Sequence, residues 1–421
     1  TYSRSEECCK GASGFTPCIY LKNLDVVKKS AECSSLLMTT LRAIEPKDIV
    51  PLAVTLPKGF QNTTKETWLQ RFENWWTLNP AFTSEFPRGW ILEEEAEIVG
   101  FIGNIPVKFV IHGEMKIAAA SASWYVDPSI RGLASMRLFN EYLKQSDVAL
   151  FLFKTEDRNL AKVVRKYGFK EYSCLSQPSE YLYIINRVQF IRQNVPNVSL
   201  LKYFHRMEIN NNKNISNNGL SEPFGHIFNY IKLCIFDCTL NEIRDLSEGV
   251  YTSSLCTYCD ESFTRLWDPH LKSFDVAMSR DTSTLNWLYF IAGRRYNRKV
   301  IQCHRSSDES LVGYMVFDFP PRKASGGGFM KLMDMCILNN DQQVLASLIS
   351  YAIEVGKQNN APVLRLWADS PDADRFLRKK FRIKWPAEKV SIIKFSEILE
   401  KNSDTVNIYS CMINPPRGID H

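Results

Sequence analysis

The sequence predicts an α+β protein with two domains, each a mixed, mainly antiparallel sheet flanked by helices. Three observations lead to this prediction. The chain has 421 residues, more than the roughly 100–200 that one domain usually needs. Its two halves match each other at several positions in the same order. Each half also shows strand signals followed by helix, strand and helix, a succession typical of a mixed sheet with helices packed on it.

The internal repeat has a spacing of 212 or 213 residues. Its four matches are Asn74-Trp75 with Asn286-Trp287, Val99-Gly100 with Val312-Gly313, Leu133-Ala134-Ser135 with Leu345-Ala346-Ser347, and Phe169 with Phe381. Any single match is explained by coincidence among common residues. Four matches in order favour two copies of a whole domain over a short-period solenoid.

The repeat and an Asn-rich stretch divide the chain. We expect an N-terminal extension of unknown role at 1–40, a first domain at 41–205, an Asn-rich linker or loop at 206–222, and a second domain at 223–421.

The elements follow in the same order in both halves. Residues 41–53 predict a short strand, a turn at Pro46 and a helix. The next signals are a strand with acidic flanks (93–113 and 308–319), an apolar strand (118–126 and 330–338), an amphipathic helix (136–145 in the first half), a short apolar strand (148–153 and 361–367) and a second helix (157–169 and 370–381).

Composition excludes several classes of protein. The net charge of +6 is too diffuse to predict a nucleic-acid partner. No apolar run reaches 18 residues and the first residues lack the apolar region of a signal peptide, so we expect no membrane partner and a cytoplasmic location. The twelve cysteines are then expected as reduced thiols. Zinc at Cys234, Cys238, Cys256 and Cys259 is the alternative to scattered thiols, and we predict no metal site.

The stretch Val126–Ser135 joins an apolar strand to a helix through Arg131-Gly132-Leu133-Ala134. A helix N-terminus carries unpaired N–H groups and a partial positive charge, and behind a strand it forms an anion site. Gly132 lets a phosphate approach the backbone, and Arg131 adds a cation for phosphate oxygens. The pattern therefore predicts a diphosphate site, with a tight strand–helix turn as the alternative.

These residues resemble the GNAT superfamily of acyl-CoA-dependent N-acyltransferases, whose signature is Gln/Arg-x-x-Gly-x-Gly/Ala, often preceded by Val-x-Pro. Val126, Pro128, Arg131, Gly132 and Ala134 match it, and Ser129 replaces the first Gln/Arg. Gly168-Phe169 matches the pair that ends the family's second helix. The resemblance implies acetyl-CoA or another acyl-CoA as co-substrate, bound by Trp124, Tyr125, Val126, Arg131, Gly132, Leu133, Ala134, Ser135 and Asn159.

The catalytic residues are less well defined by the resemblance. Many members have a Tyr four residues before the Gly of that pair as proton donor, and this chain has Val164 there. Tyr167 is either a displaced donor or a core aromatic, and water is the third option. Glu156 and Asp157 follow the strand that ends near the expected CoA sulfur. They act as general base or as caps of the next helix.

The second half departs from the signature. At the repeat spacing Arg131 becomes Gln343 and Gly132 becomes Val344, so the stretch reads as a plain helix start capped by Asn339, Asn340 or Asp341. We therefore predict one co-substrate site, in the first half, and a degenerate second domain. A basic helical face in the first half meets either the 3′-phosphate of CoA or solvent. It comprises Arg158, Lys162 and either Arg165 or Lys166.

Together these features predict transfer of an acyl group, most often acetyl in the family, to a small-molecule or peptide amine. A non-catalytic acyl-CoA-binding or scaffold protein is the alternative. A tRNA- or peptide-using ligase of the tandem GNAT-like kind is a third hypothesis, and it needs a broad basic groove. Neither the acceptor nor the oligomeric state follows from the sequence.

Overall fold

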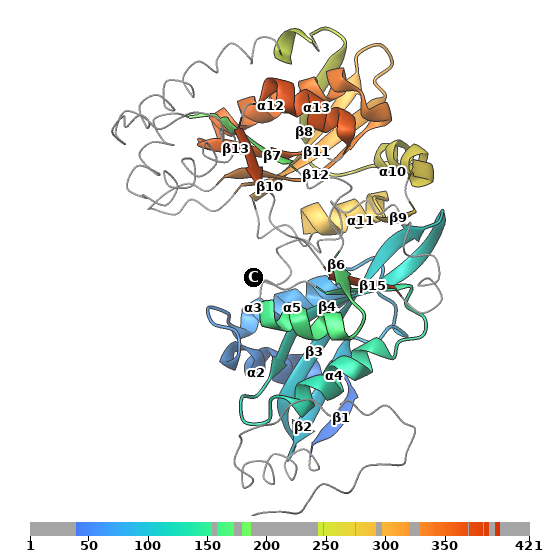
Figure 1. Ribbon diagram of the computed structural model, residues 1–421, viewed down its shortest axis with the longest axis vertical. Coiled ribbons are helices and arrows are strands. Elements are labelled where there is room, and N and C mark those ends of the chain that lie inside the picture. The colour runs from blue at the N-terminus through green and yellow to red at the C-terminus, as the bar shows by residue number, and fades with distance from the viewer. Residues whose placement is uncertain are drawn as a thin grey trace, which may run out of the picture.

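The computed structural model contains two sheets, each with helices packed on it, and one lies above the other in Figure 1. The described residues are 39–153, 158–171, 179–186, 243–246, 248–273, 275–291, 297–319, 329–368, 370–381, 383–386 and 392–395. The Asn-rich linker, Glu156, Asp157, Cys234 and Cys238 lie outside them.

The first sheet is built mainly from the first half of the chain. Its order is β1 (Thr40–Ala43), β2 (Gly89–Glu94), β3 (Glu97–Ile111), β4 (Glu114–Val126), β5 (Leu150–Phe153), β15 (Ile392–Phe395) and β6 (Lys170–Glu171), and β9 (Val276–Met278) also pairs with β3. Only the β4–β5 pair is parallel among these contacts. The sheet is therefore mixed and mainly antiparallel, as predicted.

The second sheet repeats this arrangement. Its order is β8 (Tyr251–Cys256), β10 (Asn297–Arg305), β11 (Leu311–Phe319), β12 (Met330–Ile337), β13 (Val363–Trp367), β7 (Ser179–Ile184) and β14 (Ile383–Pro386). The parallel pair is again in the middle, between β12 and β13. Each strand from β8 to β14 thus has a positional counterpart in the run from β1 to β6.

The two sheets exchange one strand each. β7 follows β6 in the chain but lies in the second sheet, between β13 and β14. β15 follows β14 but lies in the first sheet, between β5 and β6. The predicted boundary at 206–222 therefore does not separate the sheets cleanly, because each half completes the other's sheet.

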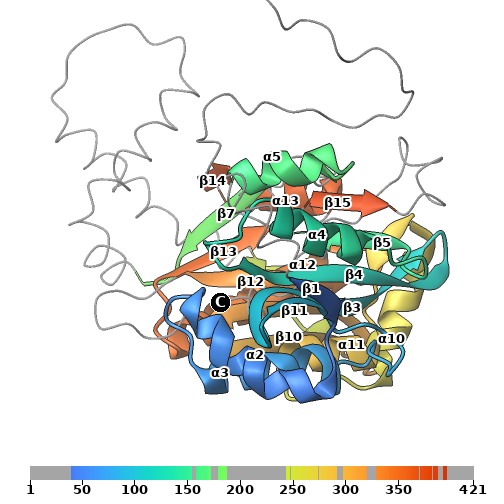
Figure 2. The ribbon, with the colours of Figure 1, turned by 90° about the horizontal axis from the view of Figure 1, so that it is seen from below.

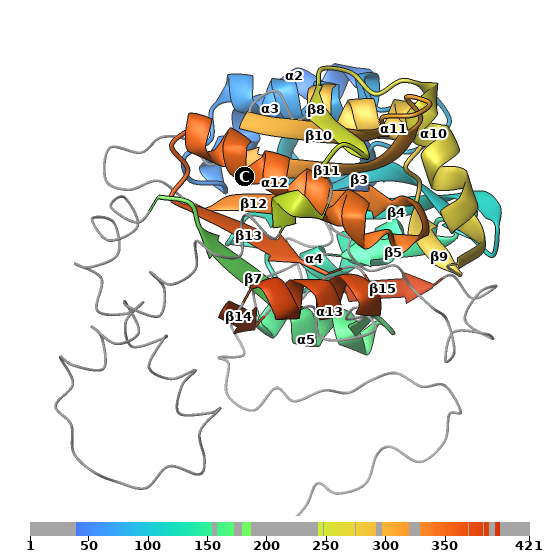
Figure 3. The ribbon, with the colours of Figure 1, turned by 90° about the horizontal axis from the view of Figure 1, so that it is seen from above.

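The helices cover both faces of each sheet. In the first half α2 (Ile49–Thr55) and α3 (Lys65–Phe72) lie on one side, and α4 (Leu133–Leu143) and α5 (Arg158–Lys166) lie on the other (Figure 2). In the second half α12 (Gln342–Gln358) and α13 (Pro371–Lys380) cover the outer face (Figure 3). α10 (Glu261–Trp267) and α11 (Thr282–Asn286) lie on the face toward the first half (Figure 1).

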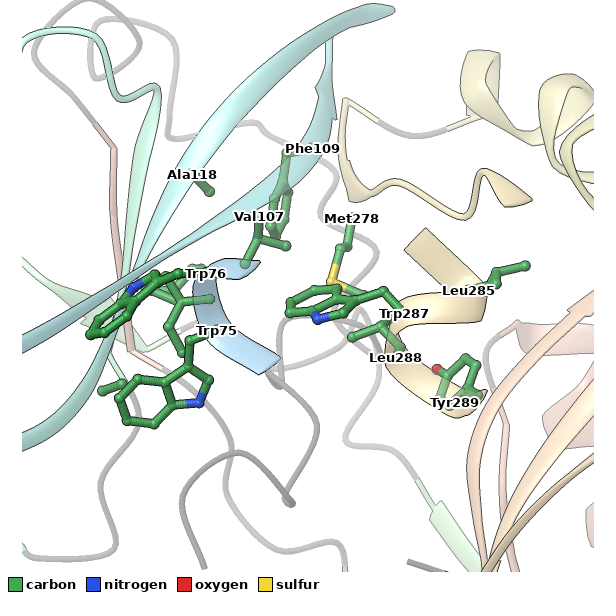
Figure 4. Close-up of a cluster of buried hydrophobic side chains, with 14 of the residues drawn as sticks. Trp75, Trp76, Val107, Phe109, Ala118, Met278, Leu285, Trp287, Leu288 and Tyr289 are labelled. Atoms are coloured by element: carbon green, nitrogen blue, oxygen red, sulfur yellow. The ribbon is translucent and has the colours of Figure 1, made fainter. Parts of the chain in front are cut away.

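An aromatic core joins the two halves. Trp75 and Trp287, the tryptophans of the repeat, are fully or almost fully buried in one hydrophobic cluster, and each lies in a π-helical turn, Glu73–Thr77 and Trp287–Ile291. Trp287 lies between α11 and strand β3 (Figure 4). Its indole Nε1 donates to the Asn74 carbonyl at 2.8 Å. The repeated Asn-Trp pair thus contributes to the contact between the halves.

One predicted strand is wrong in detail. The stretch 93–113 contains the end of β2 and all of β3, joined by a tight hairpin at Glu95 and Ala96, whose φ angles are 49° and 65°. Two positive φ values suit the hairpin turn whose twist matches the flanking strands. The sequence hides it because neither residue is the usual Asn or Gly. Within the part of the chain that the structure describes, no helix is long and apolar enough to cross a membrane.

Candidate functional site

The first sheet opens between β4 and β5. The parallel pairing joins only Ala118–Ala120 to Leu150–Leu152, whereas β4 continues to Val126. In the described residues no strand pairs with this far end of β4 on the β5 side. β5 ends at Phe153, so β4 continues beyond its parallel partner. This leaves an unpaired edge, which we call the opening, at the carboxyl end of the parallel pair, where ligands bind in open α/β sheets.

A β-bulge in β4 sets the direction of the backbone at this opening. Ser123 has a φ of 52°, and the register against β3 shifts there. Beyond the bulge, Val126 is opposite Gly100, and the next amide, Asp127 N–H, donates to Val99 O at 2.8 Å. In an antiparallel pair this makes Val126 a non-hydrogen-bonded position, so its N–H and C=O point away from β3 and toward the opening.

The loop after β4 is closed by its own side chains. Asp127 Oδ1 accepts hydrogen bonds from Ser129 N at 2.9 Å and from Ser129 Oγ at 2.6 Å. These bonds hold the pKa of Asp127 below its usual value. Arg131 Nε donates to Val126 O at 3.0 Å. Ser129, the departure from the family signature, thus has a structural use in the turn. Arg131 is exposed, and among the described residues its two terminal nitrogens have no hydrogen-bond partner.

Gly132 provides the space that the sequence predicts. Its φ of 97° and ψ of −104° suit only glycine, and an added Cβ would meet no atom within 4 Å. α4 begins at Leu133 without a side-chain cap. The amides of Leu133, Ala134 and Ser135 therefore lie in the turn whose N–H groups have no intrahelical acceptor. An open, uncapped helix N-terminus of this kind fits an anionic group such as a diphosphate.

Aromatic rings line the opening on the α4 side. Trp124 of β4 stacks on Phe139 of α4 at 4.9 Å between ring centroids, and its ring meets Phe153 at the end of β5 edge-on at 6.1 Å. Trp124 Nε1 is buried and has no hydrogen-bond partner in the described structure. An unpaired buried donor costs about 1–3 kcal/mol, so a ligand acceptor that reached this nitrogen would be favoured. The sequence did not identify Phe139 and Phe153 as site residues. Its only indications are an aromatic on the buried face of a helix for Phe139 and an aromatic at the end of a strand for Phe153.

The remaining predicted residues are only partly brought to this site. Tyr167 is half-buried and meets the Phe139 ring edge-on at 5.1 Å, and burial raises its pKa. Val164, at the family's usual donor position, is fully buried. Asn159 lies exposed in the first turns of α5. Glu156 and Asp157 precede α5 outside the described residues, so their role as base stays a prediction.

Two of the four cysteines expected as possible zinc ligands, Cys256 and Cys259, lie in the described residues and contact each other in the interior. Cys256 ends β8 and donates to the Tyr258 carbonyl, and Cys259 is 1% exposed. Within the described ranges no group of three or more His, Cys, Asp or Glu side chains is arranged to hold a metal ion.

The comparisons with known proteins bear on the fold. No protein-family model matches the chain, and no curated protein matches its sequence. A structure from Enterococcus faecalis V583, named a probable N-acyltransferase, is similar with a TM-score of 0.52 at 12% identity, covering 86% of this chain and 73% of the other. GCN5-related N-acetyltransferases from Anabaena variabilis and Kribbella flavida give the same TM-score at 10% and 9% identity, covering 86% of this chain and 73% and 72% of theirs. The predicted GNAT-like α+β fold is confirmed.

Proposed function

We propose that the first half binds acetyl-CoA or another short acyl-CoA and transfers the acyl group to an amine. One observation carries the proposal: the uncapped N-terminus of α4, with Gly132 at a φ of 97°, lies directly after the end of β4, where β4 continues unpaired beyond β5. The GNAT-like fold supports acyl transfer as the class of reaction.

The binding mode follows from the donors at the opening. The amides of Leu133, Ala134 and Ser135, with the terminal nitrogens of Arg131, would hold the diphosphate. The arm that carries the thioester would lie along the unpaired edge of β4. Trp124 Nε1 would donate to one of its carbonyl oxygens.

The chemistry would be direct attack of the amine on the thioester carbonyl. Negative charge then develops on the carbonyl oxygen, and the Val126 N–H, which points into the opening, is placed to stabilise it. A preorganised donor of this kind typically contributes about 10²–10³ in rate. Glu156 and Asp157 remain our candidates for the base that removes the amine proton.

A short acyl group is favoured by the rings at the opening. Phe139 and Phe153 are 0% and 4% exposed, and with Trp124 they fill the α4 side of the space. A long chain on this side would have to displace buried aromatic rings, which is costly in a packed interior.

The experiment measures CoA release from acetyl-CoA across a panel of small amines and peptides, read out with a thiol reagent. Gly132→Val should abolish amine-dependent release, because it forces a β-branched residue into a positive φ and fills the space above the amides. Gly113→Val is the matched control. Gly113 also has a positive φ of 82° and no atom near an added Cβ, but it lies in the β3–β4 hairpin at the opposite end of β4.

Both variants place a valine at a positive φ in open space, so a loss of release in Gly132→Val alone reports on the site. Release that survives in Gly132→Val would contradict the proposed site. Tight acetyl-CoA binding without release for any acceptor would favour the alternative, a non-catalytic acyl-CoA-binding protein.

A further inference from the structure

Tyr125 lies beside the proposed reaction centre on the face of the sheet opposite α4. Its neighbours along β4, Trp124 and Val126, pack in the cluster formed with α4, whereas Tyr125 packs in the cluster that contains α2 and α3 residues. Tyr125 therefore faces the side of the sheet on which α2 and α3 lie, one residue away from the N–H that would bind the thioester oxygen.

The Tyr125 ring is fixed by a close backbone contact. An added Cβ on Gly59 would lie 2.2 Å from the Cδ2 atom of the ring, so this loop accepts only glycine over the tyrosine. The Phe60 ring lies at 6.2 Å, tilted by 51°. Only 7% of Tyr125 is exposed. A ring held this way presents its hydroxyl at a defined place, which general acid catalysis requires.

The hydroxyl itself is not used by the fold. It has no hydrogen-bond partner in the described residues, and its oxygen is not among the buried atoms that lack a partner. Burial, and then the negative charge of Asp127, raise the pKa of Tyr125, while Arg131 opposes them. The positive charge of Lys58, in the neighbouring loop, helps to lower the pKa of Asp127. The phenol is therefore protonated at neutral pH and open to a ligand.

We propose that Tyr125 is the proton donor to the leaving CoA thiolate. The inference rests on the proposed function and adds a catalytic residue to it. The amine nitrogen forms a bond to the thioester carbon, the carbon–sulfur bond breaks, and its electron pair goes to sulfur. The Tyr125 hydroxyl gives its proton to that sulfur. The attacking nitrogen carries a positive charge after attack and loses its surplus proton as the amide forms, and this proton returns to the phenolate through water.

The other tyrosine candidate is placed less well. Tyr167 packs against Phe139, on the α4 side of the sheet and against the rings that close the opening. Val164 has no proton to give. Tyr125 supplies on β4 the acid that α5 lacks at its usual position.

The test compares three tyrosine-to-phenylalanine variants of the intact chain, each keeping the ring and removing the hydroxyl. With an accepted amine, Tyr125→Phe should lower kcat by roughly 10²-fold or more. Its dissociation constant for CoA and its unfolding midpoint should not change, because the lost hydroxyl has no partner in the described fold. Tyr258→Phe, at an exposed tyrosine of the second half, is the control and should keep the wild-type rate.

A second substrate isolates the proton step. The acetyl selenoester of CoA leaves as a weakly basic selenolate, so Tyr125→Phe should approach the wild-type rate with it. A Tyr125→Phe variant within threefold of wild type on the thioester, or a large loss in Tyr167→Phe alone, would overturn the inference and leave acyl transfer standing. If wild type releases no CoA that Gly132→Val abolishes, the proposed function fails and this inference with it.

Discussion

The N-termini of α4 and α12 occupy corresponding places in the two halves and differ in what fills them. At α4 the helix starts at Leu133 after an open Gly132 and has no side-chain cap. At α12 the helix already starts at Gln342, and Asp341 Oδ1 accepts from Gln343 N at 2.8 Å. Leu345, the repeat counterpart of Leu133, is therefore the fourth residue of its helix rather than the first.

The opening beside α12 is also filled. β12 and β13 pair only at Met330 and Lys331, so β12, like β4, continues beyond its last parallel pair. The Trp367 indole donates to Leu332 O at 2.9 Å and occupies the gap. A carboxylate at the helix start and an indole in the gap take the places that an anion and a co-substrate arm would need. On our proposal, one fold thus holds one open site and one closed counterpart.

The second half uses corresponding positions for stability. Asp334, the counterpart of Ala122, is fully buried with Arg280 at 3.1 Å, and its Oδ2 accepts from the Tyr289 and Tyr314 hydroxyls at 3.1 and 3.0 Å. Removing one partner of a buried ion pair leaves an uncompensated charge. Asp334→Asn should therefore lower the free energy of unfolding by about 3–5 kcal/mol, measured by denaturant unfolding.

Asp308→Asn serves as the control for that loss. Asp308 pairs with Arg305 at the same distance of 3.1 Å, but both side chains are exposed. The expected change is under about 1 kcal/mol. Equal losses of unfolding free energy in the two variants would contradict burial as the reason why the Asp334–Arg280 pair stabilises the fold.

The cap of α12 gives a smaller effect and sharpens the comparison. Asp341→Ala removes the acceptor of Gln343 N and of the Tyr251 hydroxyl, which lies at 2.8 Å from Asp341 Oδ2. The expected cost is about 1 kcal/mol of unfolding free energy. Titration calorimetry should detect no new CoA site, because Val344 and Trp367 remain. A second site in this variant would show that the cap alone closes the second half.

The smallest effect concerns pH. Burial, and then the charge of Arg280, lower the pKa of His270, whose ring stacks on Trp267. The folded pKa of His270 lies below the unfolded value of 6.5. The contribution of neutral His270 to the free energy of unfolding is therefore complete above pH 6.5 and decreases as the pH falls through the folded value. His270→Phe keeps a stacked ring and should lose less stability than wild type between pH 7.5 and 5.5. Identical pH dependence in both proteins would exclude His270 as a cause.

Local chemistry explains what the sequence predicted. Three features can be recognised from residues close by in the sequence: Gly132, the amphipathic helix after it and the Asn-Trp repeat. Each lies where a strand–helix turn or a buried helix face requires it. Asp341 was among the three caps expected for the second half, and it is the one that bonds.

The exchange of β7 and β15 could not be predicted in this way. Both are short strands whose partners lie about 180 residues or more away in the chain, and nothing in their own pattern distinguishes one sheet from the other. Trp124 and Tyr125 illustrate the same difficulty at the site. The sequence placed both on a strand, and only the bulge at Ser123 and the loop at Gly59 determine what their side chains meet.

The exchange of β7 and β15 also determines how acetyl-CoA binding must be tested. A chain cut at the Asn-rich linker would lack β15 beside β5 and β7 beside β13, so isolated halves would lose a strand next to each opening. Binding therefore has to be measured in the intact protein.

The most direct measurement is the stoichiometry of acetyl-CoA binding to the intact chain by titration calorimetry, with Gly132→Val and Gly113→Val alongside. We expect one molecule per chain for wild type and Gly113→Val, and a loss of affinity of about 100-fold or more, about 2.7 kcal/mol, for Gly132→Val. Two molecules per chain, or one that Gly132→Val still binds at wild-type affinity, would contradict a single site at the start of α4.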